Sequence, residues 1–179
     1  MQETEMVKLS APRLRLEEAK YFYSQFVAHC GPPRDSYFLM VAYFDAFLFA
    51  LVSVEDMVPI SVKAQLKSNE VFRFVKALRN ITMHHSVLAA LQPGAKFVRP
   101  FSRHVTEVIG SDPWASAKLA IDYPNFRAIF DAIEAERPSE KPTLDIARAY
   151  LAKLEAGLQP VFIESVLTNG LNAVAANVA

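Results

Sequence analysis

Cysteine and glycine are both scarce in this sequence, and each scarcity excludes a class of protein. The 179 residues include one Cys, Cys30, which cannot form a disulfide within the chain. A disulfide framework is therefore excluded, and a reducing, cytoplasmic compartment is expected. Only five Gly are present, and none lies between Gly31 and Gly94. This excludes the glycine-rich phosphate loops of Rossmann and P-loop proteins. The first twelve residues contain no apolar stretch, so no secretory signal is expected.

Net charge is also absent, because 19 Lys and Arg balance 19 Asp and Glu. The balance conceals a local excess of positive charge. Residues 60–110 carry eight basic side chains but only two acidic ones, Glu70 and Glu107. Three of the four His, namely His84, His85 and His104, lie in the same stretch. This composition indicates either a solvated basic surface or a site for an anion such as phosphate.

Residues 38–54 form an almost wholly apolar run of seventeen residues with Asp45 near its centre. A membrane-crossing helix needs about 20 apolar residues, and a central Asp costs about 3 kcal/mol on insertion. We therefore expect no membrane association and interpret the run as a core helix. Its aromatic residues, with two from a later helix, are most simply core, although some could line a pocket for an apolar or nucleobase ligand. They are Phe38, Tyr43, Phe44, Phe47, Phe49, Phe72 and Phe74.

Proline positions and apolar spacing predict an all-α protein, an up-and-down helical bundle forming a single domain over residues 1–179. The expected helices cover residues 13–30, 36–54, 61–91, 125–136, 144–156 and 161–175. The third of these is either broken or capped anew at Ser68-Asn69-Glu70. Residues 94–112 have no clean period, and we expect a long loop or a short hairpin there.

The residues best suited to catalysis or ligand binding lie at the end of the third expected helix. At about 100° per residue, His85 falls on the apolar face and His84 falls near Asn80, on the other side. A His on an apolar face is most often a packed core residue. The side bearing His84 also carries Lys76 and Met83. Because this side combines apolar and phosphate-binding groups, it suits a partner or a second copy of the chain.

The segment Arg79-Asn80-Ile81-Thr82-Met83-His84 resembles the signature of HEPN domains (higher eukaryotes and prokaryotes nucleotide-binding domains). That signature is an Arg followed by a polar residue, with a His four to six positions after the Arg. The helical surroundings, residues 13–91, also resemble that family. The resemblance implies a small all-α fold and, in the family's ribonucleases, RNA cleavage without metal or other cofactor through the ribose 2′-OH.

The resemblance also implies a role for each motif residue. His84 would be the general acid or base, since its ordinary pKa of about 6.5 suits proton transfer near neutral pH. Arg79 would stabilise charge on the phosphate, and Asn80 would orient the His or a phosphate oxygen. Two copies of the motif face each other in the family, so a homodimer is expected. RNA or a nucleotide would be the ligand, and an antitoxin-like or regulatory protein is a further expected partner.

Several residues outside the motif are candidates for support or substrate contact. Asp45 needs a partner in its apolar helix, and this could be Arg79, His85, a hydroxyl group or solvent. Lys76 lies one turn before the motif. Arg99 and Arg103 belong to a short segment that mixes Phe and Arg as single-strand binding surfaces do, and as structural loops also do.

Three rival interpretations remain. The first is a non-catalytic HEPN-like module that binds nucleotides or partners. The second is a metal site at His84, His85 and His104, but adjacent His side chains diverge on a helix and are a poor chelate, so no metal is expected. The third is thiol catalysis at Cys30, which the helix C-terminus before Gly31 disfavours.

Overall fold

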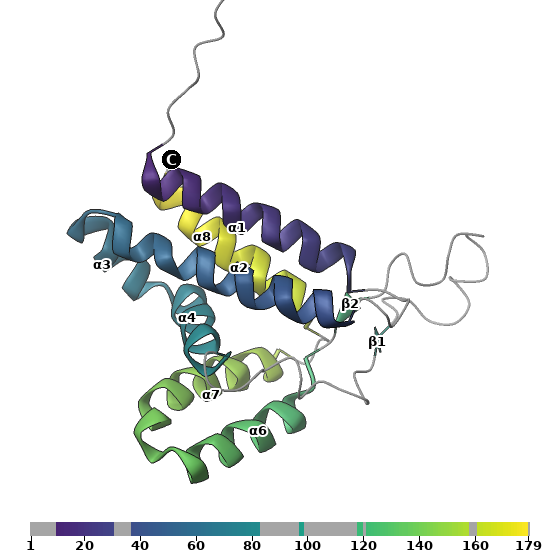
Figure 1. The fold of residues 1–179 in the computed structure, drawn as a ribbon. Helices are drawn as coiled ribbons and strands as arrows, with labels where there is room; N and C mark the ends of the chain where they lie inside the picture. The colour runs from purple at the N-terminus through teal and green to yellow at the C-terminus, as the bar shows by residue number, and fades with distance from the viewer. Residues whose placement is uncertain are drawn as a thin grey trace, which may run out of the picture.

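Helices make up nearly all of the protein that the computed structural model describes, which is residues 10–30, 37–82, 97–98, 118–119, 121–157 and 161–178. The expectation of an all-α helical bundle is confirmed (Figure 1). Buried apolar side chains from Leu16 to Val178 form one continuous cluster. The described helices therefore share one core.

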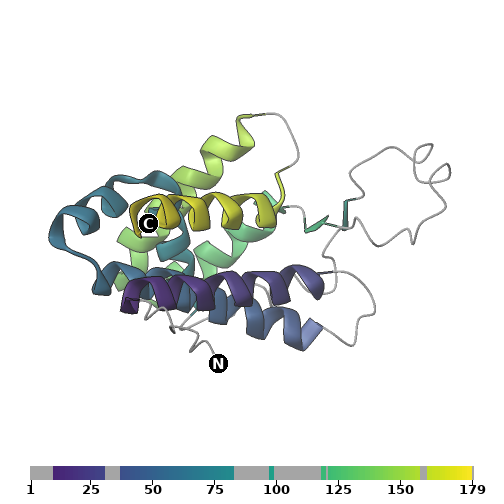
Figure 2. The ribbon, with the colours of Figure 1, turned by 90° about the horizontal axis from the view of Figure 1, so that it is seen from above.

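The first two helices form an antiparallel pair. Helix α1 (Ala11–Ala28) and helix α2 (Tyr37–Met57) lie side by side in both views (Figures 1 and 2). Aromatic rings join them, because Phe26 packs on Phe44 and Tyr23 packs on Phe47, at centroid distances of 5.5 and 5.6 Å. The two predicted helices are confirmed in this region.

The predicted third helix is two helices, α3 (Ile60–Ser68) and α4 (Glu70–Thr82). The residue between them, Asn69, has extended backbone angles and caps the second helix. Its Oδ1 accepts a hydrogen bond from the backbone N–H of Phe72 at 3.0 Å. This satisfies one of the free N–H groups at the start of α4. Of the two alternatives expected at Ser68-Asn69-Glu70, a break or a new helix cap, the chain adopts the new cap.

Helix α4 lies at the centre of the fold, in contact with α2, α3, α7 and α8. The 3.6-residue period predicts an apolar face for this helix that consists of Val71, Phe74, Val75, Leu78, Ile81 and Thr82. Its four central residues are buried and the two outer ones, Val71 and Thr82, are half-buried, but Phe72 and Ala77 are buried too. The additional burial arises because helices cover α4 on more than one side. Helix α8 approaches closely at Gly170, where a Cβ atom would lie 2.9 Å from Cγ2 of Val75.

The C-terminal helices complete the bundle. Helices α6 (Tyr123–Glu136) and α7 (Lys141–Glu155) are joined through the short 3₁₀ helix η3 (Pro138–Glu140), and α7 packs on α4. Helix α8 (Ile163–Val178) returns along α1 (Figure 2). Tyr23 and Thr168 join α1 to α8 through a hydroxyl–hydroxyl hydrogen bond of 2.7 Å. The three predicted C-terminal helices are confirmed to within a few residues.

Two short strands interrupt the helices. Strand β1 (Phe97–Val98) pairs antiparallel with strand β2 (Lys118–Leu119), with Phe97 opposite Leu119. The first strand lies within the stretch 94–112, where we expected a loop or a hairpin, and its partner lies beyond residue 112. Antiparallel pairing is thus present, but it is not contained within the predicted stretch.

Candidate functional site

Arg79 and Asn80 lie side by side near the end of the described part of α4, and both are half-buried. Nη1 of Arg79 donates a hydrogen bond of 3.1 Å to Oδ1 of Asn80. The guanidinium carbon lies 5.1 Å from the ring centroid of Phe49, on α2. These contacts hold the planar guanidinium between an amide and an aromatic ring.

The charge of Arg79 is not neutralised within the part of the chain that the structure describes. No carboxylate among those residues forms an ion pair with it, and its buried Nε has no hydrogen-bond partner there. Because the Nε is buried, an anion would be bound by the planar Nη groups, and a guanidinium without an ion-pair partner keeps its charge for that contact. This is the condition that a phosphate-stabilising Arg must meet.

The other motif residue, His84, lies outside the described residues, and so do His85, Arg99 and Arg103. Their predicted roles in proton transfer, motif support and substrate contact stay predictions. The structure therefore places Arg79 and Asn80 together, with Ile81 buried in the core, and does not describe His84.

Lys76 forms an ion pair with Glu55, at the end of α2. The Glu55 side chain is 1% exposed, whereas that of Lys76 is 38% exposed. The predicted role of Lys76 was motif support or substrate contact. Its ammonium group is engaged with a buried carboxylate, so its main contribution in the described fold is to compensate that charge.

Asp45 is half-buried on α2, and its Oδ1 is buried without a hydrogen-bond partner among the described residues. Burial raises the pKa of this carboxyl from 3.8 to about 6, since desolvation disfavours the charged form. Of its two expected charged partners, Arg79 does not form an ion pair with it in the described structure, and His85 lies outside the described residues.

Asp45→Asn should stabilise the protein at neutral pH. A carboxyl whose pKa is raised in the folded state weakens folding once it ionises, so stability falls as pH rises from about 4 to about 7. The gain should be about 1 kcal/mol at pH 7.5, after allowing for solvent screening of the half-exposed group, and should vanish at pH 4. Urea unfolding at the two pH values measures it. Asp56→Asn, which alters an exposed carboxylate of the same helix, is the control. A loss of stability in Asp45→Asn at pH 7.5 would show that the carboxylate has a favourable partner.

The aromatic residues interpreted as core divide into three groups. Tyr43 is half-buried and packs against the core. Phe44, Phe47, Phe72 and Phe74 are fully buried, as expected. Phe38 is 77% exposed and Phe49 is 49% exposed, so the core interpretation is wrong for these two. The reason is that helix α2 is apolar nearly all round, while neighbouring helices cover only part of its circumference.

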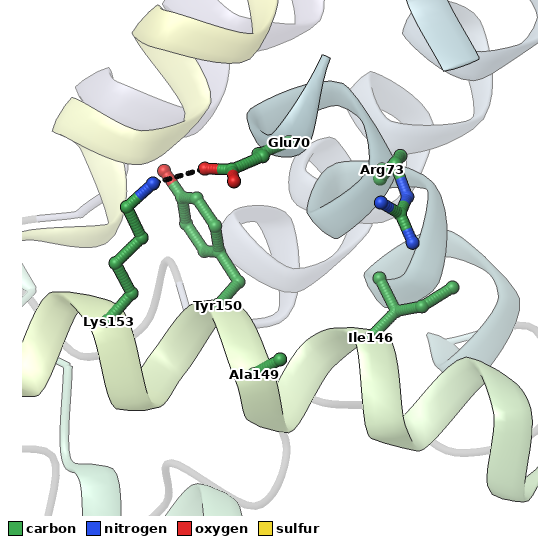
Figure 3. A pocket seen from close by; sticks show the side chains of 6 residues that line it. All are labelled: Glu70, Arg73, Ile146, Ala149, Tyr150 and Lys153. Carbon is green, nitrogen blue, oxygen red and sulfur yellow. Dashed lines mark hydrogen bonds and ion pairs between the residues drawn. The ribbon is translucent and has the colours of Figure 1, made fainter. Parts of the chain in front are cut away.

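A small cleft between α4 and α7 was not predicted from the sequence (Figure 3). It has a volume of about 120 Å³, well below the roughly 300 Å³ at which pockets for drug-sized ligands begin. An ion pair between Glu70 and Lys153 spans one end, and the Tyr150 ring stacks on Phe74 at 4.6 Å. Arg73 lies on the opposite side of the cleft. Both partners of the ion pair are largely exposed, so this cleft resembles an ordinary contact between two helices.

Cys30 is buried, and burial raises the pKa of its thiol far above the ordinary value, with a further contribution from the nearby charge of Glu164. The thiol therefore stays protonated at physiological pH, which argues against thiol catalysis. Within the described ranges, no three His, Cys, Asp or Glu side chains gather to form a possible metal site. The rival metal site at His84, His85 and His104 lies outside those ranges.

One described helix segment, Phe38–Met57 of α2, is long and apolar enough to cross a membrane, and half of it is buried inside the bundle. That degree of burial is compatible with the interpretation of α2 as a core helix. Comparison of the chain with protein-family models, curated proteins and solved structures finds no match.

Proposed function

We propose that this protein is an HEPN-like, metal-independent endoribonuclease whose site consists of Arg79, Asn80 and His84. The observation that carries the proposal is the state of Arg79. The guanidinium is held by Phe49 and Asn80, and no carboxylate among the described residues neutralises it. A residue that stabilises a phosphate must be held in a fixed position and must carry a charge that no acidic side chain neutralises.

The proposed reaction is an internal transesterification. The ribose 2′-oxygen attacks the adjacent phosphorus while a base removes the 2′-OH proton. The bond from phosphorus to the 5′-oxygen breaks, and an acid protonates that oxygen, which leaves a 2′,3′-cyclic phosphate and a 5′-hydroxyl. His84 is the group suited to moving these protons near neutral pH. The negative charge that develops on the phosphate oxygens is stabilised by Arg79, and Asn80 orients the guanidinium through their hydrogen bond.

Two proton transfers require two groups, and one His84 per chain supplies only one. The proposal therefore includes a homodimer in which each chain contributes one His84 to a shared site. Asp45, His85, Arg99 and Arg103 remain candidates for supporting the motif or contacting RNA. A cytoplasmic location and control by an antitoxin-like protein are part of the same proposal.

The test is RNA cleavage by the purified protein in the presence of EDTA, compared with His84→Ala at equal purity. Cleavage by the wild-type protein should leave cyclic phosphate ends and should be lost in His84→Ala, whose circular dichroism should be unchanged. Absence of cleavage across varied RNAs, or unfolding of His84→Ala, would contradict the catalytic assignment.

The alternative is a non-catalytic HEPN-like module that binds a nucleotide or a protein partner. It is favoured by one observation, the exposure of Phe38 and Phe49 on the same helix as Asp45. Exposed apolar residues that follow one helix face often mark an interaction surface. Under this alternative, Arg79 would bind an anion without catalysis, and the protein would bind RNA in EDTA but leave it intact.

A further inference from the structure

Phe49 is an exposed ring within a helix segment that is otherwise buried. Its chain neighbours Leu48 and Ala50 are buried, whereas the Phe49 side chain remains 49% exposed. Single exposed apolar residues are common on protein surfaces and need no function. Phe49 differs from such residues because a guanidinium lies against its ring, 5.1 Å from the centroid.

The contact places two different recognition chemistries at one point on the surface. The aromatic ring provides a flat apolar surface, and every nucleobase can stack on such a surface. Arg79 provides a guanidinium that forms no ion pair with a carboxylate among the described residues; its Nε is buried, so an anion would be bound by its Nη groups. A nucleotide carries a flat base and a phosphate within a few ångströms of each other, so a ring beside an unneutralised guanidinium is complementary to both parts.

The surrounding face of α2 is compatible with this use. Phe38, Ala42, Asp45 and Phe49 follow one another at helical spacing on one side of the helix, and Phe38 and Ala42 are exposed. Among the described acidic residues on this side of α2, Asp45 is nearest to Phe49 in the sequence. It forms no ion pair with Arg79 in the described structure.

We propose that the Phe49 ring and the Arg79 guanidinium together form a subsite for one nucleotide of single-stranded RNA. The ring stacks on the base, and the guanidinium contacts the adjoining phosphate. This inference rests on the proposed function and adds a binding residue to it. It assigns to Phe49 a role in holding the RNA that the Arg79-to-His84 motif does not include.

The experiment measures binding with a substrate that cannot be cleaved. A fluorescently labelled 2′-O-methyl oligoadenylate lacks the 2′-OH nucleophile, so anisotropy in EDTA reports the Kd alone. Phe49→Leu keeps the apolar volume but removes the stacking surface, and it should raise the Kd about 10-fold. Phe49→Tyr keeps the ring and should bind within about 2-fold of wild type. Tyr21→Leu, which removes another exposed aromatic ring, on α1, should leave the Kd unchanged.

Three results would overturn the inference. One is equal binding by Phe49→Leu and the wild-type protein. Another is no binding by the wild-type protein. The third is a change from dimer to monomer in Phe49→Leu by sedimentation, which would place the ring at a contact between two copies of the chain. The proposed ribonuclease activity is tested separately. If the Phe49→Leu variant cleaves RNA as well as the wild-type protein does, the activity does not depend on this subsite. Ring-dependent binding without cleavage supports the subsite and contradicts the ribonuclease.

Discussion

Lys76→Met should lower the free energy of unfolding by about 3 kcal/mol. The substitution keeps a long apolar side chain but removes the ammonium group that faces Glu55. The Glu55 carboxylate is almost fully buried, and its Oε1 already lacks a hydrogen-bond partner among the described residues. Without Lys76 a buried negative charge would remain uncompensated, and this is among the most destabilising changes that one substitution can produce. Chemical denaturation at neutral pH measures the effect.

A second ion pair of α4 provides the matched control. Lys153→Met removes the same type of charge from the pair between Lys153 and Glu70, in which both side chains are largely exposed. Water solvates Glu70 when Lys153 is absent, so stability should hardly change. The double variant Glu55→Met/Lys76→Met removes both charges and should recover most of the stability that Lys76→Met loses. If Lys76→Met and Lys153→Met were equally mild, Glu55 would have another route to solvation.

The helices could be predicted from the sequence because the residues that begin and end them act over a short range along the chain. Proline and glycine mark most of their ends, and the Ser68-Asn69-Glu70 segment carries a side chain able to cap a helix. The resulting boundary depends on a hydrogen bond between residues three positions apart. Contacts of such short range can be inferred from neighbouring residues in the sequence, without knowledge of how the helices are arranged.

The arrangement of helices, by contrast, decides the features that sequence analysis missed. Glu55 and Lys76 are 21 positions apart, and their pairing requires α2 and α4 to lie against each other. Phe49 was assigned to the core because the whole run around it is apolar. Its exposure depends on which side of α2 the other helices leave open. Neither fact has a local signature, so both could be established only from the packed structure.

The candidate site likewise combines local features, which the sequence reveals, with a contact between distant segments, which it does not. The motif predicted Arg79 and Asn80 together as site residues, although the hydrogen bond between their side chains was not predicted. The placement of Arg79 over Phe49 joins two distant segments and was not foreseen. That contact explains how a half-buried guanidinium keeps a fixed position without a carboxylate partner in the described fold. The role of His84 is still a prediction from the motif.

On the proposed ribonuclease mechanism, Arg79→Lys should reduce RNA cleavage about 100-fold or more. Lysine keeps the positive charge but lacks the planar set of donors, so it cannot make paired contacts with two phosphate oxygens. It would also lose the planar hydrogen bonding to Asn80 and stack less well on Phe49. Arg79→Gln removes the charge as well and should be at least as severe. Initial cleavage rates in EDTA, at substrate concentrations below KM, measure both variants.

The fold should tolerate these changes, because removal of one cation–π contact at a half-exposed ring costs about 1 kcal/mol. Thermal unfolding of each variant therefore separates lost chemistry from lost structure. Arg73→Lys is the appropriate control, since Arg73 is exposed on the same helix. It lies six residues earlier, which at 100° per residue turns it well away from Arg79. Undiminished cleavage by Arg79→Lys would show that a point charge suffices at this position. Equal losses in Arg73→Lys and Arg79→Lys would mean that α4 contributes general positive charge and not a specific phosphate contact.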